Sequence, residues 1–377
     1  MPPSPPLPPP ASLPTPAGGE PSPSVSPLSA ATRGRLLAAG LDPEAVIGLV
    51  RRALVEDLAD GPAGPVDATS VATVTPGLHG RAAIVSRAPG IVAGLSVAAA
   101  VFELVLAEEY GLRYDTADAE QAPQPVAEPV AEPVGELNTK IIFSDGDRVN
   151  PGDTVLTVAG PVLALLTAER SALNLICHLS GIATATRRWV DAVNGTGALI
   201  RDTRKTLPGL RALEKYAVRC GGGVNHRMSL ADAALVKDNH LIAAGGVLAA
   251  FTAVRTRFPG LPIEVECDTP AQVIEAVAAG ADLILCDNMA PDELRESVAI
   301  AHPAGVRVEA SGGLTLRVAR AVAETGVDFL AVGALTHSAP ALDLGLDLSL
   351  EPSPDSGGQP GRATETETET ETETETD

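Results

Sequence analysis

The sequence predicts an α/β protein whose C-terminal half is a barrel of parallel strands. After Gly197, six short apolar runs alternate with helical patterns, as in βαβ units that form a barrel or an open doubly wound sheet. Barrel enzymes collect their site residues from several strand ends, whereas an open sheet gathers them at one switch point. Here polar or glycine residues follow six strands, which favours the barrel: Arg204-Lys205, Lys237, Glu266, Asp287, Ser311-Gly312-Gly313 and Gly333.

A smaller α+β domain is predicted before the barrel. Asp42-Pro43-Glu44 is typical of a helix start, and apolar residues follow at helical spacing through Leu58. Two short β-like runs at 81–86 and 90–93 come next, and we expect Ser96 to cap a second amphipathic helix that runs to about Glu109.

The second part of this domain contains strands joined by tight Gly-Asp turns. Apolar runs at 141–143 and 155–158 flank turns at 145–147 and 151–153. Paired turns of this kind also occur in lipoyl and biotinyl hammerheads, but the acceptor lysine at a hairpin tip is missing. We therefore interpret them as structural.

Residues 163–193 predict a helix with a break at Gly181. Its apolar stripe includes Leu166, Leu173 and Cys177, and Arg170 falls on that same stripe. A guanidinium there needs a buried ion pair within the chain, or else reaches a ligand or a partner subunit, because an unpaired buried charge is very unfavourable. The pattern leaves both alternatives open.

The barrel is expected to contain strands at 198–201, 233–236, 263–266, 283–286, 306–309 and 329–332. Helical patterns lie between them, around 243–257, 270–279, 291–301 and 315–324, several with Thr or Pro as start signals.

The flanking and inserted segments are biased in composition. Residues 1–30 are rich in proline, 115–137 carry acidic residues and no basic one, and 351–377 end in a Thr-Glu repeat, so we expect all three to be disordered. The last segment accounts for −8 of the formal net charge of −21, which leaves about −13 elsewhere. This balance argues against nucleic acid as a partner.

Cysteine usage and hydropathy indicate the compartment. The four cysteines are well separated, without a Cys-x-x-Cys pair, and predict reduced thiols rather than disulfides or zinc. We identify no signal peptide and no apolar run of about 18 residues. A soluble cytoplasmic protein that does not bind membranes is the expectation.

Positive charge concentrates between Ile200 and Leu241, which hold three of the four lysines in the chain. Arg211, Lys215 and Arg219 follow at four-residue spacing and are typical of a solvated helix face. Four other cations border Pro, Gly or a strand end and predict a site for anions: Arg204, Lys205, Arg227 and Lys237.

Two glycine-bearing turns end the last two strands, at Ser311-Gly312-Gly313 and at Val332-Gly333-Ala334. Glycine lets backbone N–H groups approach an anion, and barrels often bind phosphate at this place. Glu266 and Asp287 would enter the same mouth, where carboxylates either pair with the cations or hold sugar hydroxyls and the waters of Mg²⁺. The parts together suggest a phosphorylated sugar, a polyanionic substrate and a divalent metal.

The central motifs closely resemble the quinolinate phosphoribosyltransferase family, over about residues 40–350. The resemblance is carried by the segments 202–209, 214–218, 221–227, 237–240, 264–266 and 309–313, and by Glu169-Arg170-Ser171-Ala172-Leu173-Asn174. It implies an N-terminal α/β sandwich domain at 31–165, an irregular incomplete α/β barrel at 166–338 and a segment at 339–350 that returns to the first domain. Met228-Ser229 departs from the family pattern.

The resemblance also implies a reaction: quinolinate and 5-phosphoribosyl-1-pyrophosphate give nicotinate mononucleotide, pyrophosphate and CO₂, in de novo NAD synthesis. Mg²⁺ would be bound mainly through the substrate, without a direct protein ligand set. The catalytic residues would be Lys205, Glu266 and Asp287.

The remaining roles are also carried over from the family. Arg204, His226, Arg227 and Lys237 would surround quinolinate, and Arg170 would enter the neighbouring site of a homodimer or hexamer. Thr203 and Lys205 would contact the substrates, and the phosphate would be bound by Ser311, Gly312, Gly313, Val332, Gly333, Ala334 and His337.

Two rival functions remain on this evidence. A related pyrophosphorylase could use another acceptor, since fold does not determine substrate. A Schiff-base lyase could use Lys237, since burial can tune a lysine at a strand end into a nucleophile.

Overall fold

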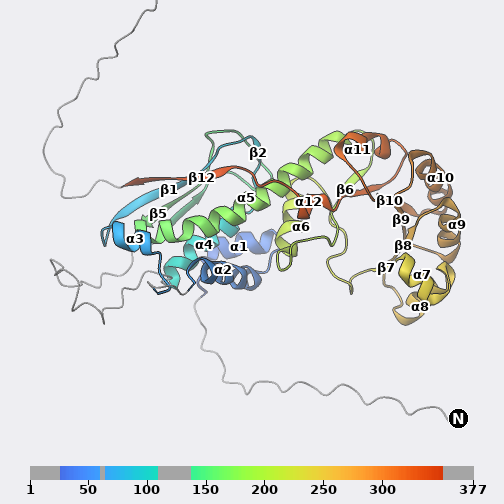
Figure 1. Cartoon of the computed structure of the whole chain (residues 1–377), viewed down its shortest axis with the longest axis horizontal. Helices are drawn as coiled ribbons and strands as arrows, with labels where there is room; N and C mark the ends of the chain where they lie inside the picture. Colours follow the sequence, from blue (N-terminus) through green and yellow to red (C-terminus); the bar gives the residue numbers. More distant parts are fainter. Residues whose placement is uncertain (1–25, 60–63, 109–136, 351–377) are drawn as a thin grey trace, which may run out of the picture.

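The computed structural model describes residues 26–59, 64–108 and 137–350. Two lobes lie end to end, and helix α5 (Val162–Ala192) runs from one to the other (Figure 1). The first lobe is built on an antiparallel sheet, and the second is built on a parallel one. The predicted pair of domains is therefore present, with α5 shared between them.

The sheet of the first lobe has the order β12-β1-β5-β3. Its strands are β1 (His79–Ser86), β3 (Asn138–Ile141), β5 (Thr154–Pro161) and β12 (Leu344–Leu350). A two-stranded ribbon of β2 (Gly90–Ile91) and β4 (Arg148–Val149) lies beside it. Strand β12 returns from the end of the chain to pair antiparallel with β1, as the alternation at 343–348 predicted.

Four helices complete this lobe: α1 (Ala30–Ala38), α2 (Pro43–Asp57), α3 (Ala68–Thr73) and α4 (Leu95–Ala107). Asp42 caps α2 as expected, but Ser96 does not cap α4. That helix begins one residue earlier, after Gly94 in a left-handed conformation (φ 92°), and Asp145 accepts a hydrogen bond from the Leu95 N–H in its first turn (3.0 Å).

The disordered N-terminal tail was predicted to run to residue 30, but the ordered structure begins a few residues earlier. Leu28 is buried and Ser29 caps α1 through Thr32, so order begins before residue 30. Residues 1–25, the insertion apart from Leu137, and residues 351–377 lie outside the described residues, so those expectations stay predictions.

Helix α5 is continuous, so the predicted break at Gly181 is wrong. A β-carbon at Gly181 would lie 2.2 Å from the backbone oxygen of Pro340, so this glycine serves close packing of the returning segment. The helix is also long and apolar enough to cross a membrane, although no apolar run of this length was identified in the sequence. However, 61% of its most apolar window is buried inside the protein, as in a core helix.

The second lobe contains a six-stranded parallel sheet in the order β6-β11-β10-β9-β8-β7. The strands are β6 (Leu199–Arg201), β7 (Ala234–Val236), β8 (Ile263–Cys267), β9 (Leu283–Asp287), β10 (Arg307–Ser311) and β11 (Phe329–Ala331). This is a barrel order with one open seam between β6 and β7. A single bridge from Arg201 to Val224 partly occupies the seam. The incomplete barrel is confirmed.

Helices follow the strands around the outside of this sheet (Figure 1). They are α6 (Arg211–Cys220), α7 (Asp238–Ala244), α8 (Val247–Arg257), α9 (Pro270–Ala279), α10 (Pro291–Ala301), a 3₁₀ turn (His302–Ala304), α11 (Leu316–Ala323) and α12 (Ala334–His337). The pattern at 243–257 thus forms parts of two helices, separated at Gly245-Gly246.

Candidate active site

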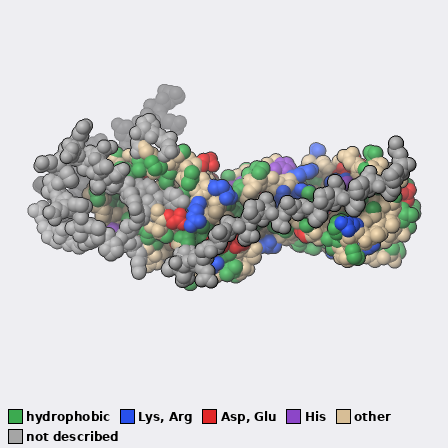
Figure 2. Space-filling model, turned by 90° about the horizontal axis from the view of Figure 1, so that it is seen from below, with side chains coloured by type: hydrophobic (Ala, Val, Ile, Leu, Met, Phe, Trp, Pro, Cys, Tyr) green, Lys and Arg blue, Asp and Glu red, His purple; other side chains and the backbone are tan. Residues whose placement is uncertain are grey.

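The C-terminal ends of the barrel strands meet at one edge of the second lobe. Asp287 is in register with Ser311, and Arg201 is in register with Ala331. Figure 2 shows Lys and Arg side chains on one face, from the middle of the molecule across the second lobe. The polar residues that the sequence placed after different strands are therefore brought to one region.

A buried ion pair organises the base of this region. Lys215 on α6 and Asp202 after β6 are both fully buried and pair with each other. Asp202 also accepts from the backbone N–H of His226 (2.8 Å), and Lys215 donates to the carbonyl of His226 (2.9 Å). The prediction of a solvated face was wrong for Lys215, because its partner comes from a different element.

The neighbours of Lys215 on α6 also have structural partners. Arg211 donates to Thr206 (3.0 Å) and to the carbonyl of Met228 (3.0 Å). Arg219 donates to Asn225 (2.8 Å). Helix α6 therefore holds the two loops that carry Arg204 and Arg227.

Arg204 and Arg227 form a pair of neighbouring cations. The pKa of Arg227 is lowered by burial and then by the charge of Arg204, and Glu264 partly offsets this. The Nε of Arg204 is buried without a hydrogen-bond partner in the described part of the chain. Two adjacent guanidiniums with an unused N–H favour a bound anion.

His226 lies beneath these cations with both ring nitrogens engaged. Its Nδ1 accepts from the backbone N–H of Arg227 (2.7 Å), and its Nε2 lies 2.9 Å from Glu264 and 3.5 Å from Glu309. His226, Glu264 and Glu309 bring donor atoms within 4.8 Å of one another. Neither glutamate was among the predicted site residues, although Glu264 and Glu266 are two residues apart and so share one face of β8.

Lys237, which follows β7, is paired with Glu266 on β8. The Lys237 side chain is 45% exposed, so its charge remains accessible at the mouth. Because its ammonium already has a carboxylate partner and is half exposed, the desolvation that would activate a Schiff-base lysine is missing.

A cavity of about 180 Å³ lies where the last strands end. It is lined by nine predicted site residues: Thr203, Lys205, Ser311, Gly312, Gly313, Val332, Gly333, Ala334 and His337. A β-carbon at Gly333 would lie 2.9 Å from the Lys205 side chain and 3.4 Å from His337 and Thr203. A larger residue at this position would displace the lysine side chain from its place over the cavity.

The loop after β9 fits against the loop after β10. Asp287 accepts from Asn288 (2.8 Å), and the Asn288 N–H donates to the carbonyl of Ser311 (2.9 Å). Gly312 has φ 89°, and a β-carbon on it would lie 2.2 Å from the Asn288 side chain. Asn288, at φ 56°, was missed by sequence reasoning, since only the fold brings it to Gly312.

Among the described residues, no hydrogen bond or ion pair joins Arg170 to this edge of the barrel. Arg170 is exposed on α5, and it forms no hydrogen bond or ion pair with any residue that the structure describes. The buried internal ion pair, one of the two alternatives, is therefore excluded for the described residues.

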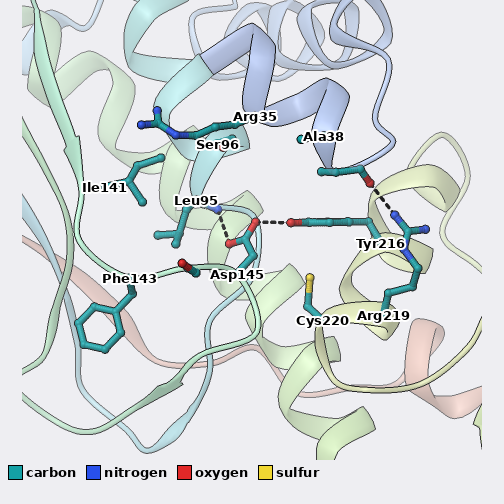
Figure 3. A pocket seen from close by; sticks show the side chains of 12 residues that line it. Arg35, Ala38, Leu95, Ser96, Ile141, Phe143, Asp145, Tyr216, Arg219 and Cys220 are labelled. Atoms are coloured by element: carbon teal, nitrogen blue, oxygen red, sulfur yellow. Dashed lines mark hydrogen bonds between the residues drawn. The ribbon is translucent and has the colours of Figure 1, made fainter. Parts of the chain in front are cut away.

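A larger cavity of about 580 Å³ lies elsewhere, between the first lobe and α6. In Figure 3, Asp145 and Tyr216 line this cavity and point toward each other, and Asp145 accepts a hydrogen bond from the Tyr216 hydroxyl (2.6 Å) and another from the Leu95 N–H (3.0 Å). Arg219 donates to the carbonyl of Ala39 (2.6 Å). These hydrogen bonds join the first lobe to α6, so the cavity lies at the junction between the two lobes.

The fold brings cations and glycine turns together at the strand ends of an α/β barrel, which is where barrel enzymes have their active sites. Two family models match the chain: "Quinolinate phosphoribosyl transferase, C-terminal domain" over residues 182–347, and the N-terminal domain of the same family over residues 122–180. The chain belongs to the quinolinate phosphoribosyl transferase family. It is therefore a phosphoribosyltransferase of pyridine nucleotide biosynthesis.

Individual relatives agree with this assignment. The chain is 48% identical to the nicotinate-nucleotide pyrophosphorylase [carboxylating] of Mycobacterium leprae over 304 residues, which are 79% of this chain and 95% of that protein. The human protein of the same name is 41% identical over 220 residues, which are 56% of this chain and 74% of the human chain. The crystal structure of nicotinate-nucleotide pyrophosphorylase from Francisella tularensis superposes with a TM-score of 0.69 at 33% identity, covering 82% of this chain and 98% of that one.

Proposed function

We propose that this protein transfers phosphoribosyl from 5-phosphoribosyl-1-pyrophosphate to quinolinate with decarboxylation, which gives nicotinate mononucleotide, pyrophosphate and CO₂ in de novo NAD synthesis. The observation that carries the proposal is the pair of guanidiniums at Arg204 and Arg227, with the buried unpartnered Nε of Arg204. A dicarboxylate with two adjacent anionic groups matches two adjacent cations. Lys237 extends this positive region, and His226 supports it from below.

The phosphoribosyl donor would occupy the cavity at the last strand ends. Backbone groups of Ser311–Gly313 and 332–334 would bind the 5-phosphate, with His337 and Thr203 beside it. Lys205 overhangs this cavity, and its ammonium would neutralise charge on the donor as pyrophosphate leaves.

Mg²⁺ would be carried mainly by the donor's pyrophosphate. Glu266 and Asp287 are carboxylates at adjacent strand ends, and each already accepts a hydrogen bond from a protein donor, Lys237 or Asn288. This suits carboxylates that hold ribose hydroxyls and metal-bound water rather than the ion itself. The metal, when bound, would neutralise charge on the leaving pyrophosphate.

The reaction follows from positioning. The quinolinate nitrogen forms a bond to the anomeric carbon while the bond from that carbon to pyrophosphate oxygen breaks. The ring nitrogen then carries a positive charge, so it accepts the electron pair released when the adjacent carboxylate leaves as CO₂, and a proton replaces the lost group. Arg204 and Arg227 would hold the ring in line with the anomeric carbon.

The working unit would be a homodimer or a larger assembly of dimers, such as a hexamer. Arg170 is exposed and has no partner among the described residues, as expected of a cation that enters the site of a neighbouring subunit. The reaction uses small soluble substrates, and we propose that it takes place in the cytoplasm.

A steady-state assay tests the proposal directly. Purified protein, quinolinate, 5-phosphoribosyl-1-pyrophosphate and Mg²⁺ are incubated together, nicotinate mononucleotide is detected by mass, and each component is omitted in turn. We expect product only with all components present. No product from folded protein, or product only with a different acceptor, would contradict the assignment.

A further inference from the structure

The cluster of His226, Glu264 and Glu309 adjoins Arg227 of the cationic site, and its two glutamates have no role in the chemistry proposed above. Glu309 is fully buried and Glu264 is 5% exposed. One oxygen of each carboxylate, Oε1, is buried without a hydrogen-bond partner among the described residues. Two unsatisfied carboxylate oxygens in one buried cluster are costly unless something is bound between or beside them.

His226 does not satisfy both carboxylates of this cluster, because each of its ring nitrogens already has a partner. The Arg227 backbone N–H donates to Nδ1 (2.7 Å), so that nitrogen carries no proton. The ring proton is therefore on Nε2, where it is donated to Glu264 (2.9 Å). The histidine thus orients Glu264, and its Nε2 lies 3.5 Å from Glu309, whose Oε1 has no hydrogen-bond partner among the described residues.

The fixed charges around the cluster do not balance either. Arg201 on β6 donates to Oε2 of Glu309 (2.7 Å) and compensates one carboxylate. Arg227, on the loop after α6, interacts with Glu264. The Lys215–Asp202 pair contacts the backbone of His226, and its two charges compensate each other. If both glutamates were ionised, the charge of Glu264 would have to be compensated by Arg227, which the substrate carboxylates also need.

We propose that Glu264 and Glu309 share one proton in the working enzyme and act as a positioning pair that leaves the charge of Arg227 available to the substrate carboxylates. A single proton removes one of the two buried negative charges, and Arg201 balances the charge that remains. Burial, and then the neighbouring charge of Glu264, raises the pKa of Glu309 to about 7, which agrees with this arrangement.

The proposal rests on the function given above, and it predicts a direction for pH dependence. Below pH 7 the pair carries one negative charge, matched by Arg201. As pH rises through about 7 the proton is lost, and an added negative charge appears beneath Arg204 and Arg227. Binding of a dicarboxylate then weakens, so the KM for quinolinate rises while kcat changes less.

The same three side chains could instead hold a divalent cation, since their donor atoms are within 4.8 Å of one another. Arg201 already donates a hydrogen bond to Glu309, and Arg227 interacts with Glu264. A divalent cation bound here would therefore be repelled by two guanidinium groups. A proton relieves the same charge without that repulsion.

Glu309→Gln tests the proposal, because glutamine is a neutral isostere of the protonated acid. The KM for quinolinate is measured from pH 6 to pH 8.5 in wild type, Glu309→Gln and the exposed control Glu275→Gln. We expect the KM of wild type and of the control to rise roughly tenfold across pH 7, and that of Glu309→Gln to stay within about threefold of its pH 6 value. An unchanged rise in Glu309→Gln, or a loss of more than about a hundredfold at every pH, would overturn the proposal.

Two further measurements keep the test open if that variant does not fold. Calorimetric titration of wild type with quinolinate at pH 7.5, in buffers of different ionisation enthalpy, should show proton uptake on binding. Absence of uptake contradicts a shared proton. Elemental analysis of purified wild type should find no stoichiometric transition metal, and one metal per chain that Glu264→Gln releases would establish the cation instead.

Thermal unfolding without substrate separates this proposal from the assignment of function. The folded pKa lies above the ordinary value for glutamate of about 4.3, so wild type should lose stability relative to Glu309→Gln as pH rises from 5 to 7 and then level off. This difference would persist even if quinolinate were not the substrate. A constant difference between the two proteins across this range would count against the proton.

Discussion

The two lobes have different interiors. Within the described residues, all five charged side chains that are buried lie in the barrel lobe or its site: Asp202, Glu214, Lys215, Glu264 and Glu309. Among the described residues, the fully buried polar groups of the first lobe are uncharged, and its helix α4 is almost entirely apolar and buried. The first lobe thus depends on hydrophobic burial, whereas the second accepts the desolvation of ions to hold loops at exact positions around a site.

The largest effect that would test this contrast comes from Lys215→Met. It leaves Asp202 as an uncompensated buried carboxylate, which should destabilise the protein by about 3–5 kcal/mol and displace the His226 loop. Urea unfolding and quinolinate kinetics measure both effects. Adding Asp202→Asn should recover part of the stability and none of the activity. Full recovery of activity would show that the pair does not position the loop.

A matched change in the first lobe is Leu104→Ala on α4. Removing a fully buried leucine should cost about 2–4 kcal/mol, through lost burial and a cavity. Unlike Lys215→Met, it should leave kcat/KM nearly unchanged at temperatures where the protein is folded. A comparable loss of activity in folded protein would mean that the core of the first lobe also positions the site.

Arg170→Ala sharpens the comparison. Arg170 lies on the part of α5 that belongs to the first lobe, and we propose that its guanidinium enters the active site of a neighbouring subunit. We expect at least a hundredfold loss of activity, about 2.7 kcal/mol, with unchanged unfolding because Arg170 is exposed. Mixing this variant with Lys237→Ala under conditions of proven subunit exchange should restore part of the activity. Complete failure of rescue would argue against a site shared between subunits.

The smallest effect is expected at the junction of the lobes, from Tyr216→Phe. It removes the hydrogen bond to Asp145, and we expect a loss of about 1–2 kcal/mol at pH 7. Burial raises the pKa of Asp145, and the tyrosine bond opposes that rise. The deficit should therefore shrink as pH falls and the carboxyl becomes protonated in both proteins. A deficit that does not depend on pH would place the loss in packing instead.

Much of the catalytic architecture was accessible from the sequence because it depends on local pattern. Strand ranges in the barrel were predicted to within one or two residues, since apolar runs between turn signals mark parallel strands. Nine of the predicted site residues line one cavity, because residues at the carboxyl ends of barrel strands must meet. The return of β12 to β1 was likewise expected from its alternation and the family resemblance.

Other features depend on contacts between distant segments. Lys215 follows a surface spacing on α6, but Asp202 approaches from another strand and buries it. Gly181 resembles a helix breaker, yet it gives room for the backbone of Pro340. The unsatisfied oxygens of Glu264 and Glu309 arise because two strands, β8 and β10, aim them at one histidine. Sequence alone determines which residues can form strands, turns and anion sites, whereas charge balance depends on which side chains the tertiary structure brings within a few ångströms, because electrostatic energies depend on distance and burial.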